Sequence, residues 1–274
     1  MSGVILALPD RPCSASRVLD AAACLGALSG ATRVNVLAIR TPPSATILPT
    51  EEVLTQRDER RIRAEEQHRI DGLKSAYDAW AAAASPSVAA GDWSDAEGLA
   101  DQVASEWGRR ADFIVLARPA GHRAEQERRA LHAALFDTGR PVLVVPPEPL
   151  FRPFGRCIAI AWRDDGRTIQ AVLSVLRWAG RAEQVHILAG TRDSAAAPKV
   201  PAILEEHGIQ ARLHVLPIAA EHAFGEALLD AAHRLGADLL VIGAFVHHPL
   251  RNVILGGVTR YMLAHADLPV LMRH

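Results

Sequence analysis

The sequence predicts an α/β protein made of two copies of one doubly wound unit, each with a five-stranded parallel sheet. Hydrophobic residues make up 49% of the 274 residues and aromatic residues only 5%, which is typical of parallel strands buried under alanine-rich helices. Short apolar runs of strand length alternate with segments of helical periodicity. The pattern of the first half also recurs in the second, which indicates duplication.

The repeat consists of three pairs of segments that occur in the same order in both halves. Two of the pairs are separated by nearly the same distance along the chain. The pair that opens the halves is further apart, so the first half carries an insertion after its opening strand. The matching segments are 4–8 with 157–161, 111–117 with 237–243, and 139–145 with 267–272.

In the second half we expect five strands separated by four helices. The last strand follows a helix and a proline, which is typical of a crossover into a parallel sheet. The expected strands are 157–162, 185–189, 212–216, 238–243 and 269–272, and the expected helices are 167–179, 198–207, 222–235 and 254–265.

In the first half we expect a helix over 14–29 with Ser14 as its N-cap. The inserted segment 51–84 is highly charged at first and alanine-rich later, and its apolar residues fall at helical spacing. It predicts a long helix that covers the sheet and turns its polar face to solvent, with a partner-binding helix as the alternative. The apolar residues are Ile62, Ile70, Leu73, Tyr77 and Trp80.

Composition excludes several classes of function. Thirty basic residues balance 31 acidic ones, so the net charge of −1 gives no support to nucleic-acid binding. Cys13, Cys24 and Cys157 lack metal-binding or redox spacing, which indicates reduced thiols, and the histidines lack zinc-site spacing. No apolar run is long enough for a membrane span, and the first residues read as a strand rather than a signal peptide. We therefore expect a cytoplasmic protein with no nucleic-acid or membrane partner and no metal site.

The loop over 243–260 is the first candidate binding site. Open parallel sheets bind ligands beyond the carboxyl ends of their strands, where the strand order reverses. Gly243 ends a strand, and Gly256 and Gly257 precede a helical pattern that begins at Val258. Backbone N–H groups at a helix start favour an anion such as phosphate, and Thr259 would add a hydroxyl. A tight turn with close packing and no ligand is the alternative.

The turn after the strand 157–162 is the second candidate. It contains Trp162, whose ring would stack on a base or serve as an ordinary core aromatic. Arg163 and the pair Asp164–Asp165 follow. The two carboxylates would hold a magnesium ion beside phosphates or, as a plainer interpretation, cap the next helix.

The run GADLLVIGAFVHHPLRNVILGGVTRYMLAHADLPVLM at 236–272 resembles the C-terminal signature of the universal stress protein (UspA) family. Nucleotide-binding members of that family carry Gly, two residues, Gly, nine residues, Gly, and then Ser or Thr. Gly243 and Gly256 fit the first and third positions. Val246 stands in place of the second glycine, and Gly257 in place of the hydroxyl residue. Nucleotide-binding members also offer Asp or Asn in the opening turn, where this chain has Arg163 followed by Asp164.

The resemblance implies tandem Rossmann-like domains of the adenine nucleotide alpha hydrolase-like kind, over 1–147 and 156–274, joined by a proline-rich linker at 148–155. It implies a stress-response or regulatory role, with ATP and Mg²⁺ as expected ligands of the second half. Without a general base or nucleophile, hydrolysis would be slow at best. The expected binding residues are Gly243, Val246, Gly256, Gly257, Val258, Thr259, Trp162, Arg163 and Asp164.

Two further expectations follow from the resemblance. The loop that starts at Arg118 has no paired glycines, so we expect the first half to bind no nucleotide. Final strands of the family pair across a two-fold axis, and Val142–Val145 and Val270–Met272 would pair within one chain as an intramolecular pseudo-dimer. Further pairing into a homodimer stays open. A scaffold that has lost its nucleotide and acts through an unknown protein partner is the alternative function.

Overall fold

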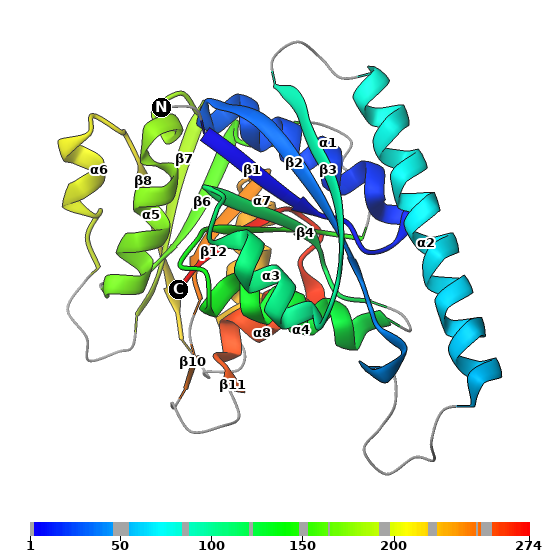
Figure 1. The fold of residues 1–274 in the computed structure, drawn as a ribbon. Helices are drawn as coiled ribbons and strands as arrows, with labels where there is room; N and C mark the ends of the chain where they lie inside the picture. Colours follow the sequence, from blue (N-terminus) through cyan, green and yellow to red (C-terminus); the bar gives the residue numbers. More distant parts are fainter. Residues whose placement is uncertain are drawn as a thin grey trace. The chain divides into compact units, whose positions relative to one another are not determined.

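The computed structural model describes residues 3–45, 55–83, 88–120, 123–147, 153–163, 165–191, 198–218, 224–244, 246–247 and 254–274. The chain divides into two compact units, Met1–Arg140 and Pro141–His274. Both contain a set of parallel strands and several helices (Figure 1). Parts of the sequence-based predictions for 51–54, 84, 148–152, Asp164, 222–223, Phe245 and 248–253 lie outside the described residues.

The first unit contains a parallel sheet in which the strands lie in the order β3-β2-β1-β4. The order reverses between β1 and β4, which confirms the doubly wound arrangement. The elements are β1 (Gly3–Leu8), α1 (Pro12–Ser29), β2 (Ala31–Arg40), the 3-10 turn η1 (Pro43–Ala45), α2 (Gln56–Ala83), β3 (Ala89–Glu97), α3 (Ala100–Gly108), β4 (Phe113–Ala117) and α4 (Ala124–Phe136).

The second unit contains five parallel strands in the order β8-β7-β6-β9-β12. Its order reverses between β6 and β9, as it does between β1 and β4. The elements are β5 (Val142–Val145), β6 (Cys157–Trp162), α5 (Gly166–Ala179), β7 (Gln184–Thr191), α6 (Ala202–Glu206), β8 (Arg212–Pro217), α7 (Phe224–Arg234), β9 (Leu239–Gly243), β10 (Val246–His247), β11 (Ile254–Leu255), α8 (Gly257–His265) and β12 (Val270–Arg273).

Strand β5 pairs with β12 in antiparallel fashion, which confirms the predicted pairing of these two strands. Val144 lies opposite Val270, and Leu143 opposite Leu271. All of these side chains are buried. By sequence, β5 closes the first repeat, yet its contacts place it in the second unit.

The same hydrogen bonds recur in both units at the start of the central strands. In the first unit, the Asp112 N–H donates to the Val4 carbonyl at 2.8 Å, and the Val4 N–H donates to the Asp112 carboxylate at 2.8 Å. In the second, Asp238 and Cys157 make the same reciprocal pair at 2.9 and 3.2 Å. The Asp238 carboxylate also accepts from the N–H groups of the two residues before Cys157, at 2.7 and 3.1 Å. This shared geometry supports duplication of one unit.

The predicted starts of α1 and α6 are wrong. Helix α1 begins at Pro12 with Arg11 as its N-cap, so Ser14 lies inside the first turn, where its hydroxyl donates to the Arg11 carbonyl at 3.2 Å. Proline is favoured in a first turn because its missing N–H has no partner there in any case. Helix α6 begins at Ala202 instead of at 198, because Pro201 disfavours helical backbone in the residue before it.

Helix α2 confirms the predicted long amphipathic helix over Gln56–Ala83. Ile70 and Leu73 are buried against Ala15 of α1 and Ala38 of β2. Ile62, Tyr77 and Trp80 are half-buried. The helix therefore covers the sheet by one narrow stripe. Among the described residues, no helix is long and apolar enough to cross a membrane.

Among the residues that the structure describes, Asp238 accepts hydrogen bonds from three backbone N–H groups and Asp112 from one, so replacing Asp238 with alanine should destabilise the protein more than replacing Asp112. We expect a loss of about 2 kcal/mol for Asp238→Ala and less than about 1 kcal/mol for Asp112→Ala. Urea unfolding followed by circular dichroism measures both. Equal losses would mean that the additional hydrogen bonds contribute nothing to stability.

Candidate functional site

The carboxyl ends of β6 and β9 lie next to each other at the edge where the second unit's strand order reverses. These two strands pair in parallel, with Ile160 opposite Val241. Trp162, half-buried, ends β6, and Gly243, buried, ends β9. The structure therefore brings Trp162 and Gly243 to one edge, which is where an open parallel sheet binds its ligand.

The predicted helix over 254–265 is wrong at its start, since α8 begins at Gly257. Ile254 and Leu255 form β11, which pairs antiparallel with β10, so that Val246 lies opposite Leu255. β-branched residues such as Val and Ile favour this extended backbone. Gly256, with φ −58° and ψ 151°, is also extended and stands as the N-cap of α8.

The first turn of α8 contains the remaining residues predicted from the glycine motif. Gly256 is buried, Gly257 is exposed, Val258 is half-buried and Thr259 is 1% exposed. No side chain caps this helix start. The first N–H groups of a helix have no partner within it, so this end offers donors and a positive dipole end to an anion.

Charged side chains within the turn after β6 stabilise it through hydrogen bonds and an ion pair. Asp165 is the N-cap of α5 and accepts a hydrogen bond from the Thr168 N–H at 2.9 Å. Arg163 donates to the Asp165 carboxylate at 2.6 Å. Burial works to raise the pKa of Asp165, but the Thr168 N–H and Arg163 outweigh burial and lower it. For Asp165, the capping interpretation is therefore confirmed, while Asp164 lies outside the described residues.

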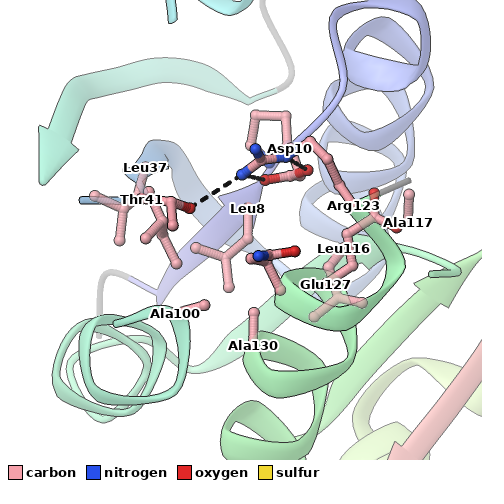
Figure 2. A pocket seen from close by; sticks show the side chains of 13 residues that line it. Leu8, Asp10, Leu37, Thr41, Ala100, Leu116, Ala117, Arg123, Glu127 and Ala130 are labelled. Carbon is pink, nitrogen blue, oxygen red and sulfur yellow. Dashed lines mark hydrogen bonds and ion pairs between the residues drawn. The ribbon is translucent and has the colours of Figure 1, made fainter. Parts of the chain in front are cut away.

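The first unit has a small cavity at the corresponding edge, between the ends of β1 and β4 (Figure 2). Its volume is about 30 Å³, which suits a water molecule and is far below the roughly 300 Å³ or more of a small-molecule pocket. Its lining includes Leu8, Asp10, Thr41, Arg123 and Glu127, and Asp10 and Arg123 lie side by side in it. This cavity, as the described residues shape it, therefore has no room for a nucleotide.

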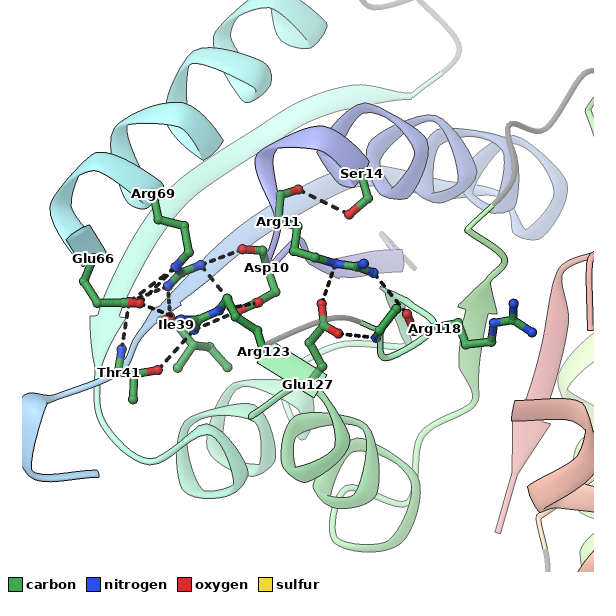
Figure 3. A network of polar contacts seen from close by, with 11 residues as sticks. Asp10, Arg11, Ser14, Ile39, Thr41, Glu66, Arg69, Arg118, Arg123 and Glu127 are labelled. Atoms are coloured by element: carbon green, nitrogen blue, oxygen red, sulfur yellow. Dashed lines mark hydrogen bonds and ion pairs between the residues drawn. The ribbon is translucent and has the colours of Figure 1, made fainter. Parts of the chain in front are cut away.

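Arg123 lies at the centre of a network of ion pairs beside this cavity (Figure 3). It is the N-cap of α4, and its guanidinium contacts Asp10 at 2.6 Å and Glu66 at 2.6 Å. Arg123 also donates to the Thr41 hydroxyl at 3.2 Å. The Arg123 side chain is 12% exposed, so its charge needs these partners.

Helix α2 contributes both Glu66 and Arg69 to the network. Arg69 contacts Glu66 at 2.8 Å and donates to the backbone carbonyls of Asp10, at 2.8 Å, and Ile39, at 2.6 Å. The Thr41 N–H donates to Glu66 at 3.2 Å. Burial works to raise the pKa of Glu66, but the bonds and charges of Arg69 and Arg123 outweigh burial and lower it.

Glu127 on α4 is the second carboxylate around which ion pairs and hydrogen bonds gather, and its pKa shifts in the opposite direction to that of Glu66. It contacts Arg11 at 2.7 Å and accepts a hydrogen bond from the Ala120 N–H at 2.7 Å. Burial raises the pKa of Glu127, and the nearby charge of Asp10 adds to the increase. The network as a whole matches three arginines with three carboxylates, so it is self-neutralised.

Sequence reasoning missed the ion-pair network, although two signals pointed to it. Asp10 and Thr41 follow β1 and β2 directly, at the edge where ligands bind. Glu66 and Arg69 lie between Ile62 and Ile70 on the stripe of α2 that faces the sheet, where a charge requires a buried partner. Among the residues that the structure describes, no group of His, Cys, Asp and Glu could hold a metal ion.

Comparison with known proteins supports the resemblance at the end of the second unit. The universal stress protein family model matches residues 218–274. No curated protein matches the chain in sequence. A universal stress protein structure from Archaeoglobus fulgidus DSM 4304 has a TM-score of 0.64 and 13% identity, and the match covers 100% of this chain and 98% of that one.

A second structure shows the same fold. It is a candidate universal stress protein from Pseudomonas aeruginosa UCBPP-PA14, with a TM-score of 0.58 and 14% identity. The match covers 98% of this chain and 92% of that one. The family match confirms the resemblance over 218–274, and the structural matches confirm a tandem fold of the universal stress type.

Glu66→Gln should destabilise the protein by about 3 kcal/mol at pH 7, because it leaves buried Arg69 and Arg123 short of one negative charge. The folded-state pKa of Glu66 is lowered, so its contribution is complete above the unfolded value of 4.5 and is lost as pH falls from there through the lower folded-state pKa. Urea unfolding at pH 7 and at pH 4 should show a smaller difference in stability between the two proteins at the lower pH.

Glu65→Gln is the matched control for that comparison, since Glu65 lies on the exposed face of α2 and pairs with Arg61 in solvent. Its loss should stay below about 0.5 kcal/mol. A loss for Glu66→Gln that is as small as this, or that does not depend on pH, would contradict the assigned role of Glu66.

Proposed function

We propose that this chain is a universal-stress-type regulatory protein of the cytoplasm, whose second unit binds an adenine nucleotide, ATP with Mg²⁺, while its first unit acts as a ligand-free partner. The observation that carries the proposal is the start of α8 at Gly256 and Gly257. This start lies within the family match and follows the strand at which the order of the sheet reverses. Phosphates would accept hydrogen bonds from the N–H groups of this first turn, which have no partner within the helix.

The adenine base of the nucleotide would lie at the edge formed by the carboxyl ends of β6 and β9. Trp162 ends β6 beside Gly243, and an indole ring is a good stacking surface for an adenine. Arg163 is exposed, and its bond to Asp165 lies at the surface, so the pair would reorganise at small cost when phosphates approach. Thr259 would supply a hydroxyl close to the phosphates, in the position after Gly257 and Val258.

Two features of the first unit support the proposal that it binds no nucleotide. Arg123 precedes α4 at the edge that corresponds to the start of α8, and two carboxylates of the unit already neutralise it. The adjoining cavity of about 30 Å³ leaves no room for a base and ribose.

A scaffold without a nucleotide is the second candidate, and the β10–β11 hairpin favours it. Val246, in the place of the family's second glycine, lies in a strand opposite Leu255. A valine adds a Cβ and two methyl groups where the family's backbone approaches the phosphates. In this case the protein would act through a protein partner, and the glycines would only shape the turn before α8.

Isothermal titration with ATP and Mg²⁺ should detect binding to the native protein and a loss of at least about tenfold in affinity for Gly256→Val. The added side chain would stand at the start of α8, where the phosphates are expected. Gly180→Val is the matched control, because Gly180 ends α5 near where β7 begins and a Cβ there makes only ordinary contact with Ile209, at 3.7 Å. Equal ATP affinity in the Gly256 variant and the native protein would rule out this phosphate site.

Protein purified quickly from cells should carry nucleotide, visible as excess absorbance at 260 nm and identified by mass spectrometry after acid release. The native protein should carry more than the Gly256→Val variant. If the native protein is empty and also ignores added ATP, the scaffold function is the better account.

A further inference from the structure

Among the described residues of the second unit, helix α2 has no counterpart of similar size. It spans 28 residues between β2 and β3, whereas α6, between β7 and β8, has five. The apolar stripe of α2 explains why the helix packs against α1 and β2, but it does not explain why the charged residues Glu66 and Arg69 lie on the same face. These two side chains reach the carboxyl edge of the sheet, beside the place where the strand order reverses (Figure 3).

Three donors from three separate parts of the first unit converge on the Glu66 carboxylate. They are the guanidinium of Arg123 before α4, at 2.6 Å, the guanidinium of Arg69 on α2, at 2.8 Å, and the N–H of Thr41 after β2, at 3.2 Å. The carboxylate is 10% exposed, so these bonds are largely shielded from water. Two guanidinium groups and one backbone N–H form a receptor for an oxyanion.

We propose that Glu66 acts as a built-in substitute ligand, which occupies an oxyanion site formed by Arg69, Arg123 and the Thr41 N–H. The natural competitor is a phosphate group, because its terminal oxygens can satisfy all three donors at once. Engagement of Glu66 by these donors and occupation of the site by phosphate exclude each other. Helix α2, through Glu66, thus keeps this oxyanion site closed to an outside phosphate.

The charges of the network explain why an outside anion could take the place of Glu66. Asp10 remains paired with Arg123 through two bonds, at 2.6 and 3.2 Å, so the guanidinium keeps its orientation when Glu66 leaves. Removal of the Glu66 charge leaves the cluster with one net positive charge. A negative ligand restores the balance, and neutral groups would not.

Anion rescue of Glu66→Gln tests the proposal. The amide removes the charge that holds this side chain against Arg69 and Arg123, so the variant should be less stable than the native protein and phosphate should displace the uncharged side chain. Inorganic phosphate, compared with chloride at equal ionic strength, should raise the melting temperature of Glu66→Gln by at least about 3 °C more than that of the native protein. Direct titration should show phosphate binding at least about tenfold tighter in the variant.

Two controls separate this site from other effects of phosphate. Glu65→Gln removes an exposed charge from the same helix and should respond like the native protein. The double variant Glu66→Gln/Arg123→Gln should lose the rescue, because one of the two guanidinium donors is gone. Nucleotide binding in the second unit does not involve Arg123, so failure of that proposed function leaves this result unaffected. A folded Glu66→Gln protein that phosphate stabilises no more than the native protein overturns the proposal.

If Glu66→Gln does not fold in either salt, hydrogen exchange of the native protein decides. Phosphate should speed the exchange of the α2 amides around Glu66 several-fold over chloride of equal ionic strength, because it competes with Glu66 for the arginines. Exchange in α5 of the second unit serves as the internal reference. Unchanged exchange in α2 overturns the proposal.

Discussion

A buried guanidinium must be matched by negative charge, and Arg123 imposes this requirement on the first unit. It lies beside the reversal of strand order, where a parallel sheet gathers the ends of its central strands. Asp10 after β1 and Glu66 on α2 supply the charge, and the Thr41 hydroxyl completes the coordination. The position of α2, the small size of the cavity and the neutrality of the edge all follow from this requirement.

The two units show how one duplicated frame can carry different edges. Each unit has the same strand order around its central strands. In each, an aspartate that directly precedes one central strand exchanges reciprocal hydrogen bonds with a residue near the start of the other central strand. The differences lie in the segments after the strands. In the first unit, charged side chains close the edge, whereas in the second a helix begins at two glycines and no side chain caps its start. Duplication preserved the parts that hold the sheet together and left the ligand edge free to diverge.

The fold could be predicted from the sequence because buried parallel strands appear as apolar runs and because the runs repeat. Helix ends were harder to place. Pro12 extends α1 ahead of Ser14, and the pairing of Val246 with Leu255 makes a hairpin where helical spacing alone suggested a longer α8. The charges on the stripe of α2 that faces the sheet signalled buried partners, but the partners themselves could not be predicted, because the ion-pair network joins residues far apart in the chain. Glu66 and Arg123 are 57 positions apart, and nothing local to either indicates the other. The binding residues of the second unit stay a prediction.

The antiparallel pairing of β5 with β12 has a consequence for how the chain can be divided. The repeats in the sequence suggest a cut before β6, yet β5 lies upstream of that point and covers one side of the last strand. Without it, the backbone beside Val270, Leu271 and Met272 would be an open, apolar sheet edge. Such an edge is a template for strand addition by another molecule. Strand β5 therefore protects the second unit from self-association, and a second repeat excised without it would tend to form oligomers or aggregates.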